Sequence, residues 1–316
     1  MNPMRTALLW GSRNEWLGRS LPRLRFTRRA VRRFMPGETL AEAVDAARGL
    51  QRAGIGSVLT QLGENVANEA EAAAVERHYQ AVFDAIDEGS LDAEVSVKPT
   101  QLGMDVRPGL AEAAAARLAE RSANAERVLW VDMEGSAYTD RTIALYGALR
   151  DATPWVGLCL QANMRRTPSD LEALLPMRPH LRLVKGAYLE PHEIAFARKA
   201  EVDGAYETLA SRILEHLAAT GAHERFAVAT HDLPLARRVR DGASARQALE
   251  ACEFQMLYGI LPGAQQRLAE YGLSVRVLIS YGEAWFAWYM RRLAERPANV
   301  AFALRSLVGG RDSAEH

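Results

Sequence analysis

An alternation of short apolar segments with longer helical segments constrains this chain more than any other feature. The short segments are rich in β-branched and aromatic residues, and the longer ones in Ala, Leu, Glu and Arg. This alternation is typical of a parallel sheet with helices packed outside it. The expected strands are Gly56–Leu59, Glu94–Lys98, Val128–Met133, Trp155–Gln161, Leu181–Lys185, Phe226–Thr230, Cys252–Leu257 and Ser274–Ile279. The expected helices are Glu64–Glu88, Leu110–Ala125, Asp140–Asp151, Ser169–Leu175, Gly204–Thr220, Pro234–Arg240, Gly263–Tyr271 and Glu283–Glu295.

The number of these units predicts the fold class. Eight strand-helix units in about 260 residues fit a (β/α)8 TIM barrel better than an open, doubly wound sheet. The preceding residues read as helical, with an amphipathic helix over Leu40–Leu50 set off by Pro36 and Gly37. No Pro/Gly/Ser-rich linker divides the chain. The sequence therefore predicts an N-terminal helical arm over residues 1–50 and a barrel over residues 51–316.

Charge and cysteine content limit the partners and the compartment. The net charge is zero, which argues against a nucleic-acid partner bound through bulk charge. Cys159 and Cys252 lie in apolar runs without a CxxC or Cys/His metal spacing, as expected of reduced thiols in the cytoplasm. No apolar run reaches the length of a membrane span. The arginine-rich arm leaves room for peripheral membrane contact at most, and a solvated arm is the preferred interpretation.

Polar side chains stand near the ends of six expected strands, where barrel enzymes carry their chemistry. They are Lys98; Asp132 and Glu134, with the apolar Met133 between them; Gln161 and Asn163; Arg182 and Lys185; Thr230, His231 and Asp232; and Glu253 and Gln255. Each alone could simply begin a loop, and Asp232 is also a candidate cap for the helix that follows. Arg182 is harder to explain, because an arginine inside an apolar strand needs a paired anion. Asp132 on a nearby strand is available, so we expect a lumen that binds a polar or anionic ligand.

Several kinds of chemistry lack their usual motifs. His231 and Asp232 are adjacent and would point to opposite faces of a strand, and no HxH or HExxH occurs, so a metal site is not expected. The GxSxG and GxGxxG motifs are absent as well. Schiff-base chemistry at Lys98 or Lys185 stays open, because barrel aldolases use strand lysines. A barrel that binds a carboxylate without catalysis is the other alternative.

The segment Trp285–Asn299 reads as a helix that carries two adjacent arginines, Arg291 and Arg292. One face holds Trp285, Trp288, Tyr289 and Arg292. Glu295 lies within reach of both arginines. Taken alone, this is best explained as a solvated basic edge. A ligand carboxylate bound by both arginines is the alternative.

Six motifs occur in the order found in one known family: SVKPTQLG, VDMEGSAYTD, LRLVKGAY, ATHD, CEFQMLYG and WYMRRLAERPAN. With them the chain resembles proline dehydrogenase, the FAD-dependent oxidase of proline, and the barrel domain of the bifunctional proline utilization A proteins. The resemblance runs from about residue 50 to the C-terminus. The sequence ends where an aldehyde dehydrogenase domain would begin in the fused proteins, which implies the monofunctional form.

The resemblance implies a distorted (β/α)8 barrel with FAD over the strand C-termini and the last helix above the flavin. Arg291 and Arg292 would then bind the proline carboxylate, with Lys98 beside them, and Asp132 and Arg182 would form the active-site pair. Tyr188 and Glu295 would help to build the pocket. The implied FAD contacts are Met133, Gln161, Lys185, Gly186, Ala187, Thr230 and His231. Together with the polar strand ends, the resemblance makes the carboxylate clamp the preferred interpretation of the two arginines.

The eighth strand departs from the family pattern Arg-x-Tyr-x-Pro-Tyr/Val-Gly. Leu278 stands where the tyrosine is expected, and Ser280 where the proline is. Loss of a ring and a hydroxyl from the pocket wall would loosen discrimination between proline and substituted prolines such as hydroxyproline. The departure therefore affects the expected substrate range more than the expected reaction.

The implied reaction is the oxidation of L-proline to Δ1-pyrroline-5-carboxylate, the first step of proline catabolism to glutamate. FAD would pass the electrons to a quinone, and pyrroline-5-carboxylate dehydrogenase would take the product. A flavin carries the electron chemistry of such a reaction, while the protein positions and tunes it.

Overall fold

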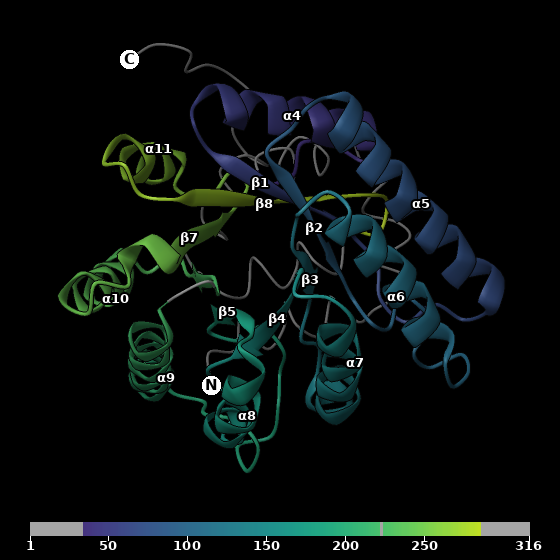
Figure 1. Cartoon of the computed structure of the whole chain (residues 1–316). Helices are drawn as coiled ribbons and strands as arrows, with labels where there is room; N and C mark the ends of the chain where they lie inside the picture. Colours follow the sequence, from purple (N-terminus) through teal and green to yellow (C-terminus); the bar gives the residue numbers. More distant parts are fainter. Residues whose placement is uncertain (1–33, 222–223, 286–316) are drawn as a thin grey trace, which may run out of the picture.

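Parallel strands close into a barrel in the computed structural model, which describes residues 34–221 and 224–285 (Figure 1). The strands are β1 (Gly56–Gln61), β2 (Ala93–Val97), β3 (Leu129–Val131), β4 (Val156–Gln161), β5 (His180–Val184), β6 (Phe226–Ala229), β7 (Cys252–Leu257) and β8 (Val275–Tyr281). Each strand pairs in parallel with the next, and β8 pairs with β1. This confirms the predicted (β/α)8 fold.

Helices follow the strands and surround the barrel (Figure 1). The α-helices are α4 (Leu40–Arg52), α5 (Glu69–Glu88), α6 (Leu110–Ala123), α7 (Thr139–Ala152), α8 (Thr167–Leu174), α9 (Lys199–Thr220), α10 (Leu233–Ala245) and α11 (Pro262–Glu270). Short 3-10 helices are η2 (Ser136–Tyr138), η3 (Leu175–Met177) and η4 (Leu249–Ala251). The predicted start of α5 at Glu64 is wrong, because Asn68 caps the helix by accepting a hydrogen bond from the Glu71 amide at 2.9 Å.

Helix α4 packs against β1 and β8, between α11 and α5 in the outer ring (Figure 1). Its buried face carries Ala43, Val44 and Ala47. Thr39 caps it by accepting a hydrogen bond from the Glu42 amide, and the Glu42 carboxylate accepts one from the Thr39 amide at 3.0 Å. The boundary expected after residue 50 falls within this helix, and the division into arm and barrel stays a prediction.

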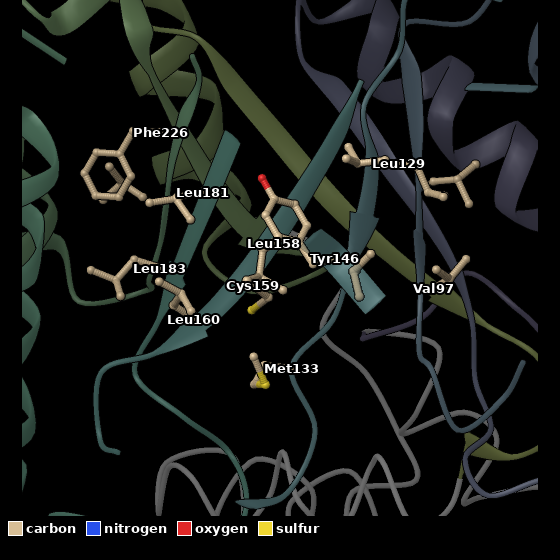
Figure 2. Close-up of a cluster of buried hydrophobic side chains, with 14 of the residues drawn as sticks. Val97, Leu129, Met133, Tyr146, Leu158, Cys159, Leu160, Leu181, Leu183 and Phe226 are labelled. Atoms are coloured by element: carbon tan, nitrogen blue, oxygen red, sulfur yellow. The ribbon is translucent and has the colours of Figure 1, made fainter. Parts of the chain in front are cut away.

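The side chains on the outer faces of the strands pack against the helices. Figure 2 shows Leu158 and Leu160 of β4 with Leu181 and Leu183 of β5 in this layer, together with Tyr146 of α7. Both faces of each strand are covered, as the near-continuous apolar strand sequences require. This layer holds the strands in the register that directs alternate side chains into the barrel.

Charged side chains fill the interior near the N-terminal ends of the strands. Arg225 forms an ion pair with Glu94, and the Arg276 Nε lies 3.1 Å from Glu253 Oε2 and 3.7 Å from Glu94 Oε2. Arg276 also reaches Asp92 through Nη1 at 2.9 Å. Burial by itself would raise the pKa of Glu94, but the two arginines outweigh it and hold the pKa below its usual value.

The prediction that Glu253 belongs to the strand-end groups is wrong. Glu253 is the second residue of β7, so it lies at the opposite end of the barrel from the mouth, which is the end where the carboxyl ends of the strands meet. The error arose because Glu253 and Gln255 lie on the same face of β7 and were grouped by face, although Glu253 stands near the start of the strand. Glu253 belongs to the charged base of the barrel.

Replacing Arg276 with methionine should destabilise the protein by about 3–5 kcal/mol, since Glu253 and Glu94 would lose a buried counter-charge. Urea unfolding at neutral pH measures the change. The matched control is Arg117→Met, which breaks an exposed pair with Glu76 and should cost less than about 1 kcal/mol. Equal losses in both variants would contradict the role given to the base.

Candidate active site

The side chains of Arg182 and Asp132 meet inside the barrel. Arg182 lies mid-strand in β5, while Asp132 directly follows β3 and donates its amide to the Val97 carbonyl at 2.9 Å. The Arg182 Nη1 lies 3.0 Å from Asp132 Oδ1. Ser96 of β2 joins them, donating through Oγ to Asp132 at 2.8 Å and accepting from Arg182 at 3.0 Å. The pairing expected from the sequence is confirmed.

Arg182 keeps hydrogen-bonding capacity that the described residues do not use. Its side chain is 3% exposed, yet Nε and Nη2 have no partner within the described part of the chain. Buried donors normally find acceptors, so unused ones mark a position where a ligand can supply them. Lys98 adds a second cation, with Nζ 3.9 Å from Asp132 Oδ2.

Lys185 follows β5 and is held by two carboxylates. Its Nζ lies 2.5 Å from Asp203 and 2.9 Å from Asp232, and Lys199 contacts the same two aspartates. Asp232 also caps α10 by accepting a hydrogen bond from the Leu235 amide at 3.3 Å, which confirms the predicted cap. Burial would raise the pKa of Asp232, but hydrogen bonds from the two lysines hold it far below its usual value.

The turn after β5 brings the chain close to the end of β4. Gly186 has φ +102°, and a Cβ there would overlap the Asn163 amide oxygen, so only glycine fits. Asn163 donates its own amide to the Lys185 carbonyl at 3.0 Å. Its buried Oδ1 has no partner among the described residues. This second unused polar atom and Ala187, which is partly exposed, lie at the same end of the barrel as Arg182.

Several expected ligand contacts are engaged within the protein. Gln161 donates to the Glu134 carbonyl at 2.8 Å, and His231 Nε2 accepts from the Leu257 amide at 2.9 Å. Thr230 accepts from the Asp232 amide at 3.2 Å. Met133 is 7% exposed and belongs to the hydrophobic core. The structure gathers these residues at one end of the barrel.

Of the remaining predicted pocket residues, two lie in the described part of the chain. Tyr188, after β5, donates its hydroxyl to Glu64, after β1, at 3.2 Å across the mouth. Leu278 of β8 is partly buried and packs inside the barrel against the cluster that contains Trp130. Three others lie outside the described residues: Arg291, Arg292 and Glu295.

The sequence predicts Glu134 as a strand-end residue but does not predict its environment. It is 3% exposed and accepts hydrogen bonds from the Thr100 amide at 3.0 Å and hydroxyl at 2.6 Å. Burial raises its pKa to about 7, although the Thr100 bonds and Lys98 act in the opposite direction. No sequence signal reports this burial. Ser96 was missed too, although alternation along β2 places it on the same face as Lys98.

Neither a metal cluster nor a membrane-spanning helix is found in the part of the chain that the structure describes. No group of three or more His, Cys, Asp or Glu residues there is arranged to hold a metal ion. No helix there is long and apolar enough to cross a membrane. Cys159 and Cys252 are buried free thiols.

Structural comparison shows the fold in larger proteins. The crystal structure of proline utilization A from Bdellovibrio bacteriovorus, a protein inactivated by N-propargylglycine, matches 98% of this chain with a TM-score of 0.80 and 20% identity. This chain covers 40% of that protein. A structure of proline utilization A from Bradyrhizobium japonicum matches 88% of the chain with a TM-score of 0.71.

Sequence comparison identifies the family. The profile described as Proline dehydrogenase matches residues 43–305. Proline dehydrogenase 1 of Bacillus subtilis subsp. natto is 35% identical over 283 residues, covering 89% of this chain and 92% of its own. Proline dehydrogenase of Deinococcus radiodurans is 33% identical over 284 residues, which cover 88% of this chain and 90% of the relative. With its barrel, its buried Arg182–Asp132 pair and these relatives, the chain belongs to the proline dehydrogenase family.

Proposed function

We propose that this protein oxidises L-proline to Δ1-pyrroline-5-carboxylate with a bound FAD. The observation that carries the proposal is Arg182, a buried arginine in a chain of this family, whose Nε and Nη2 have no acceptor among the described residues. A cation held in this way favours a ligand that carries or develops negative charge. Asp132 and Ser96 hold the guanidinium on one side only, through Nη1.

The residues at the mouth suit a flavin. Gly186 lets the turn after β5 lie against Asn163, while Arg182 offers donors and Asn163 offers an acceptor that no described residue uses. When bound, FAD supplies the two-electron acceptor for the hydride equivalent that leaves proline. The residues proposed to hold it are Met133, Gln161, Lys185, Gly186, Ala187, Thr230 and His231.

The proposed substrate site combines charge and shape. Arg291 and Arg292 bind the proline carboxylate through paired hydrogen bonds and so orient the ring. Lys98 adds positive charge beside Asp132. The pocket walls come from Tyr188, Glu295 and Leu278, and the aliphatic Leu278 leaves room that favours tolerance of substituted prolines. Asp132 and Arg182 act as the catalytic pair.

The Schiff-base alternative is less well supported. Such chemistry needs a neutral, desolvated amine, whereas Lys185 contacts two carboxylates and Lys98 lies beside Asp132. A barrel that only binds a carboxylate is disfavoured as well, because an interior ion pair costs desolvation without adding much stability. We further propose a quinone as the electron acceptor, pyrroline-5-carboxylate dehydrogenase as the enzyme that takes the product, and a cytoplasmic location with at most peripheral membrane contact through the arginine-rich arm.

The purified protein should be yellow, with a flavin absorption band that bleaches when L-proline is added without oxygen and returns with a quinone. Anaerobic absorption spectroscopy measures this change, with D-proline as the control substrate. Borohydride treatment in the presence of substrate tests the alternative. Covalent trapping on a lysine in a colourless protein would reject the proposed function in favour of a Schiff-base lyase.

Replacing Arg291 or Arg292 with alanine should raise the KM for proline by about a hundredfold or more, because each removes a charged contact with the carboxylate. Flavin content should not change, since neither residue is proposed to hold the cofactor. Steady-state kinetics and the visible spectrum measure the two effects. Arg267→Ala on the exposed face of α11 is the matched control. A near-normal KM in either variant would reject the clamp.

Glu134 should make stability depend on pH. Its pKa is raised from 4.5 to about 7 by burial, so folding favours the protonated form. The corresponding stability is present below about pH 4.5 and is lost as pH rises through 7, by up to about 3 kcal/mol. Relative to Glu134→Gln, the wild type should therefore lose stability between pH 5 and pH 8 in urea unfolding. Glu112→Gln on the exposed face of α6 is the control, and parallel curves for wild type and Glu134→Gln would contradict the burial argument.

A further inference from the structure

The indole of Trp130 lies close to two arginines. The Arg182 Cζ is 4.5 Å from the ring centroid, and the Arg225 Cζ is 5.8 Å from it. Trp130 belongs to β3 and is 0% exposed. A guanidinium over an indole face is attracted to the ring, and more strongly where water is excluded. Trp130 therefore contacts one arginine of the active site and one of the charged base.

Two contacts hold the indole in place. Its Nε1 donates to Glu94 Oε2 at 2.8 Å, and Glu94 is itself bound by Arg225 and lies 3.7 Å from Arg276. On another side the ring lies against the backbone of Gly157 in β4. A Cβ at Gly157 would come within 2.5 Å of the indole Cε3, so the ring occupies the space that any side chain there would need. The ring is thus fixed at its Nε1 and at its six-membered ring.

Arg182 needs such a support. Among the described residues its hydrogen bonds all involve Nη1, which contacts Asp132 and Ser96 at 3.0 Å each. These two bonds anchor the guanidinium at one end, whereas no hydrogen bond among the described residues holds the side that carries Nε and Nη2. The directions of Nε and Nη2 depend on the plane of the guanidinium. Trp130, whose ring centroid lies 4.5 Å from the Arg182 Cζ, is placed to restrict that plane.

We propose that Trp130 is a positioning residue for Arg182. Its indole sets the plane of the guanidinium, and with it the direction in which the unused Nε and Nη2 donors point. The charged base of the barrel supports this arrangement, because Glu94 orients the indole. The inference rests on the proposed function and adds that the unused donors of Arg182 point toward the bound flavin, where a cation stabilises the negative charge of the reduced form.

The test compares Trp130→Phe and Trp130→Leu with Trp155→Leu. Trp155 packs against the same small apolar cluster as Trp130, but it precedes β4, at the other end of the barrel from Asp132. Trp155 is partly buried, so Trp155→Leu controls for loss of a tryptophan from the same cluster without loss of a contact to Arg182. Midpoint potential of the flavin, flavin content, thermal unfolding and kcat with KM for proline are measured for each protein.

Trp130→Leu should lower kcat/KM about tenfold, mainly through kcat, and shift the flavin midpoint potential to a more negative value, because a misdirected cation stabilises reduced flavin less. Trp130→Phe keeps an aromatic face and should lie between Trp130→Leu and the wild type in both quantities. Trp155→Leu should lower the temperature of thermal unfolding but should change neither kcat/KM nor the flavin midpoint potential.

Three outcomes would overturn the inference. The first is a potential and kcat/KM in Trp130→Leu that match those of Trp155→Leu. The second is a Trp130→Phe variant as impaired as Trp130→Leu, which would mean that the aromatic face is not what matters. The third outcome decides if Trp130→Leu does not fold. It is a crystal structure of Trp130→Phe in which Arg182 keeps its wild-type orientation although the flavin midpoint potential has changed.

A wild-type protein that lacks flavin or does not oxidise proline would reject the proposed function itself. Failure of the proposed function can therefore be told apart from failure of the role proposed for Trp130.

Discussion

Burial of the Arg182 guanidinium inside the barrel is the constraint to which the rest of the interior responds. A buried charge is costly unless other groups compensate it. Asp132 supplies the opposite charge, Ser96 bridges the two side chains, and the cation lies over the Trp130 ring. These residues come from three strands, so the arrangement exists only when the barrel is closed. Only the Nε and Nη2 donors of Arg182 have no acceptor among the described residues, and these are the donors proposed to bind the ligand.

The two ends of the barrel interior differ in how fully their polar groups are satisfied. At the base, Arg276 contacts Asp92, Glu253 and Glu94. At the mouth, the donors of Arg182 and the amide oxygen of Asn163 have no partner among the described residues. A satisfied network gives rigidity, whereas buried groups without partners mark a site for a ligand. The base therefore serves stability, and through Glu94 and Trp130 we infer that it also steadies the mouth.

Much of the fold was predictable because local patterns carry it. The bounds of Cys252–Leu257 were correct, and the Arg182–Asp132 pair followed from one arginine in an apolar strand. The start of α5 was missed because Asn68 acts as a cap within a segment of helical composition. Glu253 was placed at the wrong end of its strand. Periodicity indicates which face a residue occupies, but it is a poor guide to element ends.

The sequence alone determined the fold class, the strands and the order of the family motifs, since these depend on hydrophobic period and on residue identity along the chain. The tertiary structure decided which side chains meet. Ser96 bridges Asp132 and Arg182, burial moves the pKa of Glu134 to about 7, and the Trp130 ring lies close to both Arg182 and Arg225. The physical reason is that all these contacts join different strands. Their distances are set by barrel closure, which spacing along the chain does not encode.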